Sequence, residues 1–449
     1  MKEVNIVFPK KIAGLFFLLI VLVGIFGQEI TIFFTGDTHG KILPEEKTHD
    51  LYFRGPEKQG GAAYLGGLLK KLQKRYKNVI TVDSGDIFDG AYITDKFNGL
   101  PQIEVMNNLK YDLLCPGNHD FRFSLDRLIE YGENSSFDII CTNIVYKYNF
   151  QPVFKPWKII EKDGIKIGFL SFLLDAPVYQ ITAPEIRIID PEQIAAYWIS
   201  ELKKNGADII VFLNHLGLSE DRKIAEKFSP DIIIGGHSHS VLKKEERINN
   251  TVIVHAGSYY SYLGQLNLKF DDNKKFKIDY VLHEITSEKI QKDSEVDEII
   301  NKFYKQVNEK LGEKLGYLPV NLSRKGNKQT SSLYKFIVKA VIEETKADIA
   351  DFNMAGMRGD LKKGTVTLKD IYNVLPFDNE AVYAKIYGRD FIRDRYLFSS
   401  SPVIEDKLYI VVTNSYVASL SPAFRNSKEK WVDSRSFRDI VADYIRNNY

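Results

Sequence analysis

Short runs of apolar residues alternate with amphipathic stretches from Glu29 to about residue 285. The runs at 29–35 (EITIFFT), 78–83 (NVITVD) and 230–236 (PDIIIGG) have the length and the β-branched content that are typical of buried strands. Residues 62–76 (AAYLGGLLKKLQKRY) instead place their apolar residues three and four positions apart, which predicts a helix. Strands that alternate with helices predict a layered α/β domain, in which several strands could still pair in antiparallel fashion.

The pattern changes after residue 285. A stretch rich in charged residues follows at 287–312, and its apolar residues recur at helical spacing, which predicts a connecting helix. Beyond it, further helices are expected near 333–345 and 436–447. The chain is therefore expected to have four parts, namely an N-terminal segment (1–27), a catalytic domain (28–285), a connecting helix (286–317) and a smaller, shortened α/β domain (318–449).

Composition limits the classes of protein to consider. The 449 residues are too many for one compact core, and an apolar fraction of 44% with a charged fraction of 27% excludes wholesale disorder and a protein with several membrane spans. The net charge is +2 and no long basic run occurs, so we expect no nucleic-acid partner. The two cysteines, Cys115 and Cys141, are too few for a disulfide framework or a thiolate-rich metal site.

The first 27 residues have the order of an export signal. Lys10 and Lys11 precede an uncharged apolar run, Ile12 to Gly27, and polar residues follow it. The run is only slightly short for a membrane span, so an uncleaved anchor formed by residues 12–27 is the alternative to a cleaved signal peptide. In both cases we expect the rest of the chain to be exported, to the periplasm or the extracellular space, with the membrane as a partner only if the segment is uncleaved.

Five polar loops, each after an apolar run, carry the residues that indicate chemistry. They are GDTHG (36–40), DSGD (83–86), GNHD (117–120), NHLG (214–217) and GGHSHS (235–240). Oxygen and imidazole ligands without sulfur suit Mn²⁺, Zn²⁺, Fe or Co²⁺. So many ligands exceed the needs of one ion and fit two ions about 3.5–4 Å apart, which clamp the attacking and leaving oxygens of a phosphoryl displacement. The candidate residues are Asp37, His39, Asp86, Asn118, His119, His215, His237 and His239.

Each loop alone has an ordinary structural explanation. An Asp-x-His at the end of a strand is more often a turn than a pair of ligands, and the asparagine of GNHD can cap a helix. His255 also ends an apolar run, but we interpret it as a loop histidine with partners of its own. Only the occurrence of all five loops in order, each after an apolar run, indicates one shared site.

These loops resemble those of the calcineurin-like metallophosphoesterases, in particular the two-domain exported 5′-nucleotidases and UDP-sugar hydrolases. The resemblance extends to GGAAYLGGLLKKL (60–72), KYDLLCPGNHDF (110–121) and ADIIVFLNHLG (207–217), and covers nearly all of residues 30–285. It implies a four-layered α/β/β/α catalytic domain. It also implies one ion on Asp37, His39, Asp86 and His239 and a second on Asp86, Asn118, His215 and His237, with Asp86 shared.

The resemblance gives His119 the catalytic position that faces the phosphate. Members of this family usually carry a carboxylate three residues after that histidine, whereas this chain has Arg122. Asp120 is adjacent and Asp126 lies about one helical turn beyond, so each is a candidate for the missing carboxylate. We place Asp120 with His119 as the catalytic residues. Loss of an orienting carboxylate would lower the basicity of the imidazole and its value as a proton donor.

The resemblance is weaker beyond Leu318. The segment NMAGMRGDL (353–361) is similar to the phosphate-binding loop of the family, and VLPFDN (374–379) is similar to its base-stacking loop. The resemblance therefore implies substrate contacts from Asn353, Arg358, Phe377 and Tyr416.

Parts of the family's nucleoside pocket are missing. A further family arginine falls near Gln329, where only Lys328 or Arg324 could replace it, and the GGDG loop that grips a ribose is replaced by LSPA (420–423). We therefore expect an exported, metal-dependent hydrolase of phosphate esters, 5′-nucleotidase-like, that acts by in-line attack of a metal-bound water on a small phosphoester or nucleotide. The alternatives are a cyclic-nucleotide or nucleotide-sugar diesterase, and an exported binding protein on a hydrolase scaffold.

Overall fold

The computed structural model describes residues 27–46, 58–88, 91–176, 179–377 and 379–449. The predicted signal peptide or anchor lies outside these residues, except for its last residue, Gly27. Within the described ranges, no helix has both the length and the apolar character needed to cross a membrane.

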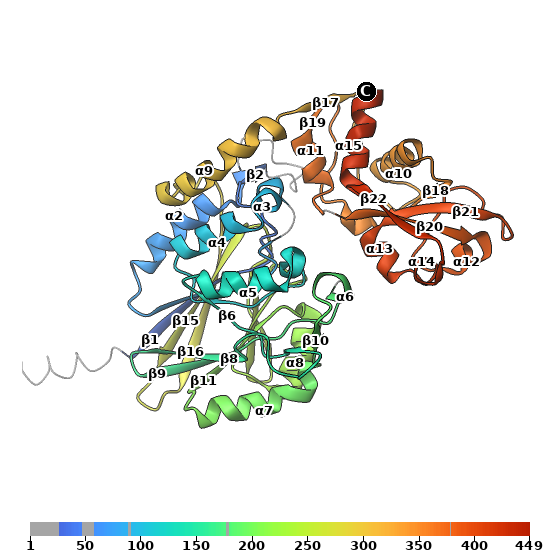
Figure 1. Cartoon of the computed structure of the whole chain (residues 1–449). Coiled ribbons are helices and arrows are strands. Elements are labelled where there is room, and N and C mark those ends of the chain that lie inside the picture. Colours follow the sequence, from blue (N-terminus) through green and yellow to red (C-terminus); the bar gives the residue numbers. More distant parts are fainter. Residues whose placement is uncertain (1–26, 47–57, 89–90, 177–178, 378) are drawn as a thin grey trace, which may run out of the picture.

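Two six-stranded sheets form the centre of the first domain (Figure 1). The first has the order β16–β15–β1–β4–β5–β6, with bounds Phe276–Glu284, Tyr262–Phe270, Glu29–Thr35, Val79–Asp83, Leu113–Leu114 and Asp138–Ile139. The second has the order β13–β14–β12–β11–β9–β8, with bounds Glu246–Ile248, Thr251–His255, Ile232–Gly235, Ile209–Asn214, Ile165–Leu170 and Trp157–Lys162.

Apolar side chains on both faces of the central strands explain this packing. In β1, Ile30 and Phe34 belong to the core between the two sheets, whereas Phe33 packs with the helices outside the first sheet. In β11, Val211 belongs to the same inner core and Phe212 to the core under the helices of the second sheet. Because successive side chains point to opposite faces, a strand that is covered on both sides has to be apolar at nearly every position.

Helices cover the outer face of each sheet. On the first sheet these are α2 (Ala62–Gln73), α3 (Tyr92–Lys96), α4 (Leu100–Asn108), α5 (Leu125–Asn134) and α9 (Ser294–Leu311). On the second sheet they are α7 (Pro191–Lys204) and α8 (Leu218–Phe228). The expected four-layered α/β/β/α architecture is confirmed.

Parallel pairing gathers the polar loops at one edge of each sheet. β1, β4, β5 and β6 run parallel in the first sheet, and β9, β11, β12 and β14 run parallel in the second. The carboxyl ends of parallel strands lie at the same edge, which is where α/β proteins place their sites. β1, β4 and β5 end just before the first three polar loops, and β11 and β12 end at the other two.

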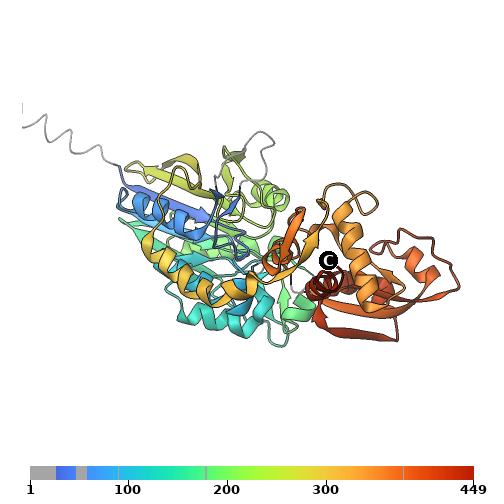
Figure 2. The same cartoon turned by 90° about the horizontal axis from the view of Figure 1, so that it is seen from above.

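The second domain is a smaller α/β unit that lies beside the first (Figures 1 and 2). Its sheet has the order β18–β21–β20–β22, with bounds Ile349–Ala350, Leu408–Asn414, Glu380–Tyr387 and Lys430–Ser436, and a separate ribbon pairs β17 (Lys314–Leu318) with β19 (Gly364–Thr367). Its helices are α10 (Ser332–Thr345), α11 (Leu368–Val374), α12 (Gly388–Arg393), α13 (Ser415–Leu420), α14 (Pro422–Asn426) and α15 (Phe437–Asn448).

The expected connecting helix is present as α9, but it is not a free linker. Its apolar face, which includes Val296, Ile300 and Phe303, is buried in the same core as α2 and α4. The long hairpin of β15 and β16 was not expected from the sequence. Short elements complete the chain, namely β2 (Glu45–Glu46), β3 (Lys58–Gln59), β7 (Ile144–Tyr146), β10 (Ile186–Ile188), α6 (Tyr179–Thr182) and the 3₁₀ turns at Asp120–Phe123 and Met354–Gly356.

Candidate metal centre

The loops at the carboxyl ends of the two sheets bring their acidic and histidine side chains together. Three trios have potential ligand atoms within 4.8 Å of one another. They are Asp37, His39 and His239; His39, Asp86 and His119; and Asp86, His215 and His237. His39 and Asp86 each belong to two trios, so the three trios form one continuous cluster rather than separate sites.

The backbone is strained at five of the candidate ligands. Left-handed φ values of 53°, 47°, 56°, 72° and 52° occur at Asp37, His39, Asp86, His237 and His239. Such values cost of order 1–3 kcal/mol each in residues other than glycine and persist where the surroundings enforce them. Their concentration in these loops indicates a functional site, because packing alone gives no reason to strain five ligand candidates at once.

Asp86 lies at the centre of the cluster. Its Oδ1 accepts a hydrogen bond from the backbone N–H of His119 at 2.8 Å. Its Oδ2 is 3.2 Å from Nε2 of His215 and 3.7 Å from Nε2 of His39. One carboxylate oxygen therefore faces imidazoles from both ends of the cluster, which is the geometry required of a shared ligand.

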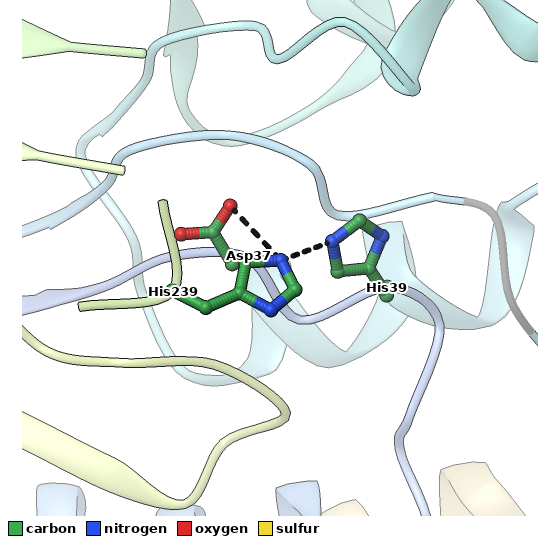
Figure 3. A group of neighbouring side chains, drawn as sticks. All are labelled: Asp37, His39 and His239. Carbon is green, nitrogen blue, oxygen red and sulfur yellow. Dashed lines mark hydrogen bonds and ion pairs between the residues drawn. The ribbon is translucent and has the colours of Figure 1, made fainter. Parts of the chain in front are cut away.

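Asp37, His39 and His239 form one end of the cluster (Figure 3). The Nε2 atoms of His39 and His239 are 2.9 Å apart, and Nε2 of His239 is 3.8 Å from Oδ1 of Asp37. Two imidazole nitrogens at that distance need a proton or a cation between them. Asp37 and His39 are almost completely buried, whereas the side chain of His239 is 23% exposed.

His215, His237 and Asn118 form the other end. Nδ1 of His215 lies 2.7 Å from the carbonyl oxygen of Ser84, which fixes the ring. Its buried Nε2 faces Oδ2 of Asp86 at 3.2 Å. Nδ1 of His237 lies 3.0 Å from Oδ1 of Asn118, so the amide joins this group as well.

Burial and charge determine which histidines are neutral. Burial, together with neighbouring positive groups, lowers the pKa of His237 and that of His239 to about 4. Burial also opposes charge on His215, but the Asp86 carboxylate outweighs it and raises the pKa of His215 to about 10. Neutral imidazoles are the form that binds metals, and a cation beside Asp86 would displace the proton of His215.

The donors of this site fit two divalent ions. The resemblance assigns Asp37, His39, Asp86 and His239 to one ion and Asp86, Asn118, His215 and His237 to the other, and the three trios contain all of these residues except Asn118. Cations at these two positions would explain the close pair of Nε2 atoms on His39 and His239, and would displace the proton between His215 and Asp86.

His119 lies between the cluster and the second domain. Its ring contacts the edge of His39, with ring centroids 5.1 Å apart. On another side it stacks with Phe377, with centroids 5.4 Å apart and an interplanar angle of 23°. An imidazole beside the cluster is well placed to act on a phosphate bound there.

Asp120 has a different role from the catalytic one expected. Its carboxylate accepts hydrogen bonds from four backbone N–H groups, at 2.7–3.0 Å, and it is buried. These donors are Asp86, Ile87, Phe88 and Gly117. Asp120 therefore ties the DSGD loop to the GNHD loop and leaves little capacity for His119. Burial and the Asp86 carboxylate raise its pKa to about 7, against the effect of the N–H donors.

The other expected substitute, Asp126, is exposed to solvent in the first turn of α5, so no packing holds it against His119. Arg122, which replaces the family carboxylate, turns instead to Asp95, with Nη2 to Oδ1 at 3.1 Å. The residue at position 122 thus differs from the family pattern both in its charge and in the residue with which it pairs.

The second domain contributes two of the four predicted substrate residues to this site. Phe377 reaches His119, and the guanidinium of Arg358 lies 5.1 Å from the Phe377 ring centre. Burial lowers the pKa of His39 and of His239, and the positive charge of Arg358 lowers both further.

The other two predicted substrate residues are less close to the cluster. Asn353 accepts a hydrogen bond from Nδ2 of Asn414 at 2.8 Å, inside the second domain. Tyr416 is 43% exposed on α13, and the described residues show no ring contact between it and Phe377.

Both candidates for the missing family arginine have partners inside the second domain. Nζ of Lys328 forms an ion pair with the buried Asp351, at 2.7 Å to Oδ1 and 2.8 Å to Oδ2. Arg324 donates from Nη1 to the carbonyl oxygen of Met357 at 3.0 Å. Both residues stabilise the second domain.

Sequence reasoning missed Tyr259. Its ring contacts His39 and His239, with centroids 5.8 and 5.5 Å apart, and its backbone N–H donates to the carbonyl oxygen of Asp37 at 3.0 Å. Its φ of 60° repeats the strain of the ligand loops. The available signal was the polar segment GSYYS after the run at 251–255, which has the same form as the other five loops.

Two further residues, His255 and Cys115, lie outside the proposed ligand sets. Nε2 of His255 lies 2.9 Å from Oδ2 of the buried Asp221, so this histidine has a partner of its own. Cys115 is fully buried in the core between the sheets, where it packs with apolar side chains.

Comparison with known proteins agrees with this geometry. Residues 30–241 match the family described as calcineurin-like phosphoesterase, and residues 313–394 match the 5′-nucleotidase C-terminal domain. The chain is 26% identical, over 431 residues, to a 5′-nucleotidase of Vibrio parahaemolyticus, and the match covers 84% of this chain and 75% of the relative.

Solved structures show the same fold across both domains. A 5′-nucleotidase precursor from Thermus thermophilus has a TM-score of 0.83 at 22% identity, covering 94% of this chain and 96% of the other. A sulfate thiohydrolase from the same organism has a TM-score of 0.77 at 15% identity, covering 93% and 94%. Fold and site thus define a metal-dependent phosphoric ester hydrolase. The chain belongs to the calcineurin-like phosphoesterases and carries the C-terminal domain of the 5′-nucleotidases.

Proposed function

We propose that this chain hydrolyses phosphate monoesters with two divalent ions, and that nucleoside 5′-monophosphates are among its substrates. The observation that carries the proposal is the position of Asp86, whose Oδ2 faces His215 at 3.2 Å and His39 at 3.7 Å. A carboxylate shared between two sets of oxygen and imidazole ligands suits a two-ion phosphoryl-transfer site. The 5′-nucleotidase of Vibrio parahaemolyticus, similar over most of both chains, supports the substrate class.

The ligand sets assign the residues that hold the ions. Bound divalent ions would polarise the phosphate oxygens and supply a nucleophile at neutral pH. Oxygen and nitrogen donors of this kind suit Mn²⁺, Zn²⁺, Fe or Co²⁺. The metal ligands in this proposal are Asp37, His39, Asp86, Asn118, His215, His237 and His239.

His119 and Arg358 act on the substrate in this proposal. His119 is held beside Asp86 by its backbone N–H, and its ring lies beside that of His39, where it can protonate or stabilise the transferring group. Arg358 offers a planar guanidinium, which binds two phosphate oxygens at once and fixes the phosphate for in-line attack. Asn353, Phe377 and Tyr416 complete the proposed substrate contacts.

The state of the nucleoside pocket sets the expected efficiency. Phe377 can stack on a base for about 1–3 kcal/mol. The LSPA segment supplies no aspartate for the ribose, and a charge-assisted hydrogen bond of that kind contributes roughly 1.5–3 kcal/mol. These contributions are similar in size, so we expect measurable but inefficient hydrolysis of nucleoside 5′-monophosphates, with weak discrimination between ribose and deoxyribose.

A substrate screen tests this function directly. The protein from residue 28 onward, purified with Mn²⁺, is assayed against nucleoside 5′-monophosphates, a small aryl phosphate, cyclic nucleotides and nucleotide sugars, together with Asp86→Ala. The matched control is Asp208→Ala, since Asp208 directly precedes β11, at the opposite end of that strand from the site. Phosphate release that depends on Asp86 but not on Asp208 supports the proposal. Turnover of diesters alone, or binding without turnover, contradicts it.

We also propose that residues 1–27 export the protein. The proposal rests on the order of charge and hydropathy in this segment, with two lysines before an uncharged apolar run. A fusion of residues 1–35 to a reporter should leave the cytoplasm, and sequencing of the mature N-terminus should read from near Gln28. Membrane retention with Met1 intact would instead identify an anchor, and a cytosolic reporter would contradict export.

A further inference from the structure

An ion-pair network links the two domains beside the site. Asp95, on α3 of the first domain, lies between two arginines. Nη2 of Arg122 is 3.1 Å from its Oδ1, and Nη2 of Arg438, on α15 of the second domain, is 3.9 Å from its Oδ2. The side chain of Arg438 is only 2% exposed and that of Asp95 only 13%, so water screens these charges weakly.

Arg438 also holds a loop of the second domain. Its Nη1 donates to the carbonyl oxygen of Pro376 at 3.0 Å and to that of Leu375 at 3.4 Å. Its guanidinium lies 3.7 Å from the ring centre of Tyr372, and that ring meets Tyr92 of the first domain with centroids 4.8 Å apart. The end of α11 and the residues after it are thus fixed by the same arginine that faces Asp95.

The next residue in this loop is Phe377, which stacks on His119. The contacts therefore run without a break from Arg122 through Asp95 and Arg438 to Phe377 and the catalytic histidine. The path begins at the position where relatives were expected to carry a carboxylate for that histidine, and it returns to the same imidazole from the second domain.

We propose that Arg122 is a positioning residue for His119. Through Asp95 and Arg438 it holds the loop at 375–377, and this loop presses Phe377 against the imidazole. A ring packed on one side has fewer orientations, so more of the enzyme has His119 directed at the phosphate. The inference rests on the proposed function for its effect on rate, but the network itself is tested without activity.

The kinetic test uses Arg122→Met, which removes the charge and keeps the length of the side chain. We expect kcat for a small aryl phosphate to fall about tenfold, a part of the 10²–10⁴ that a positioned acid contributes, with both metal ions retained. Asp95→Asn, a nearly isosteric change, should have the same effect. Arg122→Lys keeps the ion pair and should restore most of the rate. The matched control is Arg127→Met, since Arg127 on α5 pairs only locally with Glu130, at 2.7 Å.

Repeating the substitution in a His119→Asn variant separates an effect on the position of the imidazole from a general loss of structure. In His119→Asn, the substitution Arg122→Met should lower kcat no further, because the network acts through the imidazole. An additional tenfold loss in that background, or an unchanged rate for both Arg122→Met and Asp95→Asn in the wild-type background, would overturn the inference while leaving the phosphoesterase function intact.

Hydrogen exchange tests the network independently of turnover. The amide of Leu375 is bonded to the carbonyl oxygen of Ile371 at 2.8 Å, so a peptide covering 372–377 reports on the loop. Its exchange should become about fivefold faster in Arg122→Met and in Asp95→Asn, and stay unchanged in Arg127→Met. Unchanged exchange in both network variants would show that the loop is held by other contacts. If no phosphoester is hydrolysed at all, the proposed function fails, and this measurement alone decides the inference.

Discussion

At the scale of single residues, the geometry of the site depends on the partner that each polar atom has. Oδ1 of Asp86 accepts a hydrogen bond from the backbone N–H of His119, and Oδ2 faces the two imidazoles. Nδ1 of His215 lies against the carbonyl oxygen of Ser84, so that Nε2 points toward Asp86. A buried donor or acceptor without a well-formed hydrogen bond costs about 1–3 kcal/mol. Nε2 of His215 avoids that cost because it faces the Asp86 carboxylate at 3.2 Å, and a cation bound beside Asp86 would displace the proton between them.

His119→Asn is predicted to separate chemistry from metal binding. Its backbone N–H, which holds Asp86, remains, so metal analysis should still find two ions per chain. Without the imidazole, kcat should fall by on the order of 10²–10⁴. An unchanged kcat would remove this residue from the mechanism, whereas loss of the ions would show that it acts as a ligand.

Asp120→Asn is predicted to damage the loops rather than the chemical step alone. One carboxylate oxygen becomes an NH₂ group that faces backbone N–H donors, so at least one buried donor loses its partner, at about 1–3 kcal/mol or more. Thermal unfolding should show a lower midpoint, and metal content should fall with it. Asp126→Asn is the control, because Asp126 is exposed. Full stability and metal content with a reduced kcat would return Asp120 to a catalytic role.

At the scale of elements, the ends of the strands determine where the site lies. The positions of these strands were the part of the structure most predictable from the sequence. β1, β4, β11 and β12 are apolar at nearly every position because both faces are covered, so their runs stood out and their ends located the loops. β5 and β6 are only two residues long, and in β16 exposed residues alternate with half-buried ones. The hydropathy pattern therefore indicated these strands less clearly. The partners of Asp120 and Arg122 depend on contacts between segments that are distant in the sequence, and the spacing of residues along the chain does not predict such contacts.

Gly117→Ala is predicted to disrupt the metal centre through one methyl group. A Cβ at this position would lie 2.2 Å from Oδ1 and 2.3 Å from the backbone nitrogen of Asp86, so Asp86 must move. We expect a loss of about 1–3 kcal/mol in the free energy of unfolding, with reduced metal content. Gly132→Ala on α5 is the matched control. Its Cβ meets only Ile139, at 3.4 Å, and should stabilise the helix by up to about 1 kcal/mol. Equal metal content in the two variants would contradict the packing argument.

At the scale of the whole molecule, both domains contribute side chains around the candidate metal centre. The first domain supplies the clustered ligands, and the second brings Arg358 and Phe377 to them across the interface that Asp95 and Arg438 share. Figure 2 shows the second domain against the side of the first, with α9 as the connection. The sequence resemblance was weaker in the second domain, and the candidates for the missing family arginine, Lys328 and Arg324, have partners inside that domain.

Arg358→Met is predicted to weaken the binding of every phosphoester substrate. A charge-assisted hydrogen bond contributes roughly 1.5–3 kcal/mol, so KM for a small aryl phosphate and for nucleoside 5′-monophosphates should both rise at least about tenfold. Arg358→Lys should recover only part of this, because an ammonium does not bind two phosphate oxygens in the same plane. Arg389→Met is the control, since Arg389 pairs with the exposed Asp406 at 3.2 Å. If KM rises for nucleotides alone, Arg358 contacts the nucleoside rather than the phosphate, and the proposed orientation of the substrate between the domains is wrong.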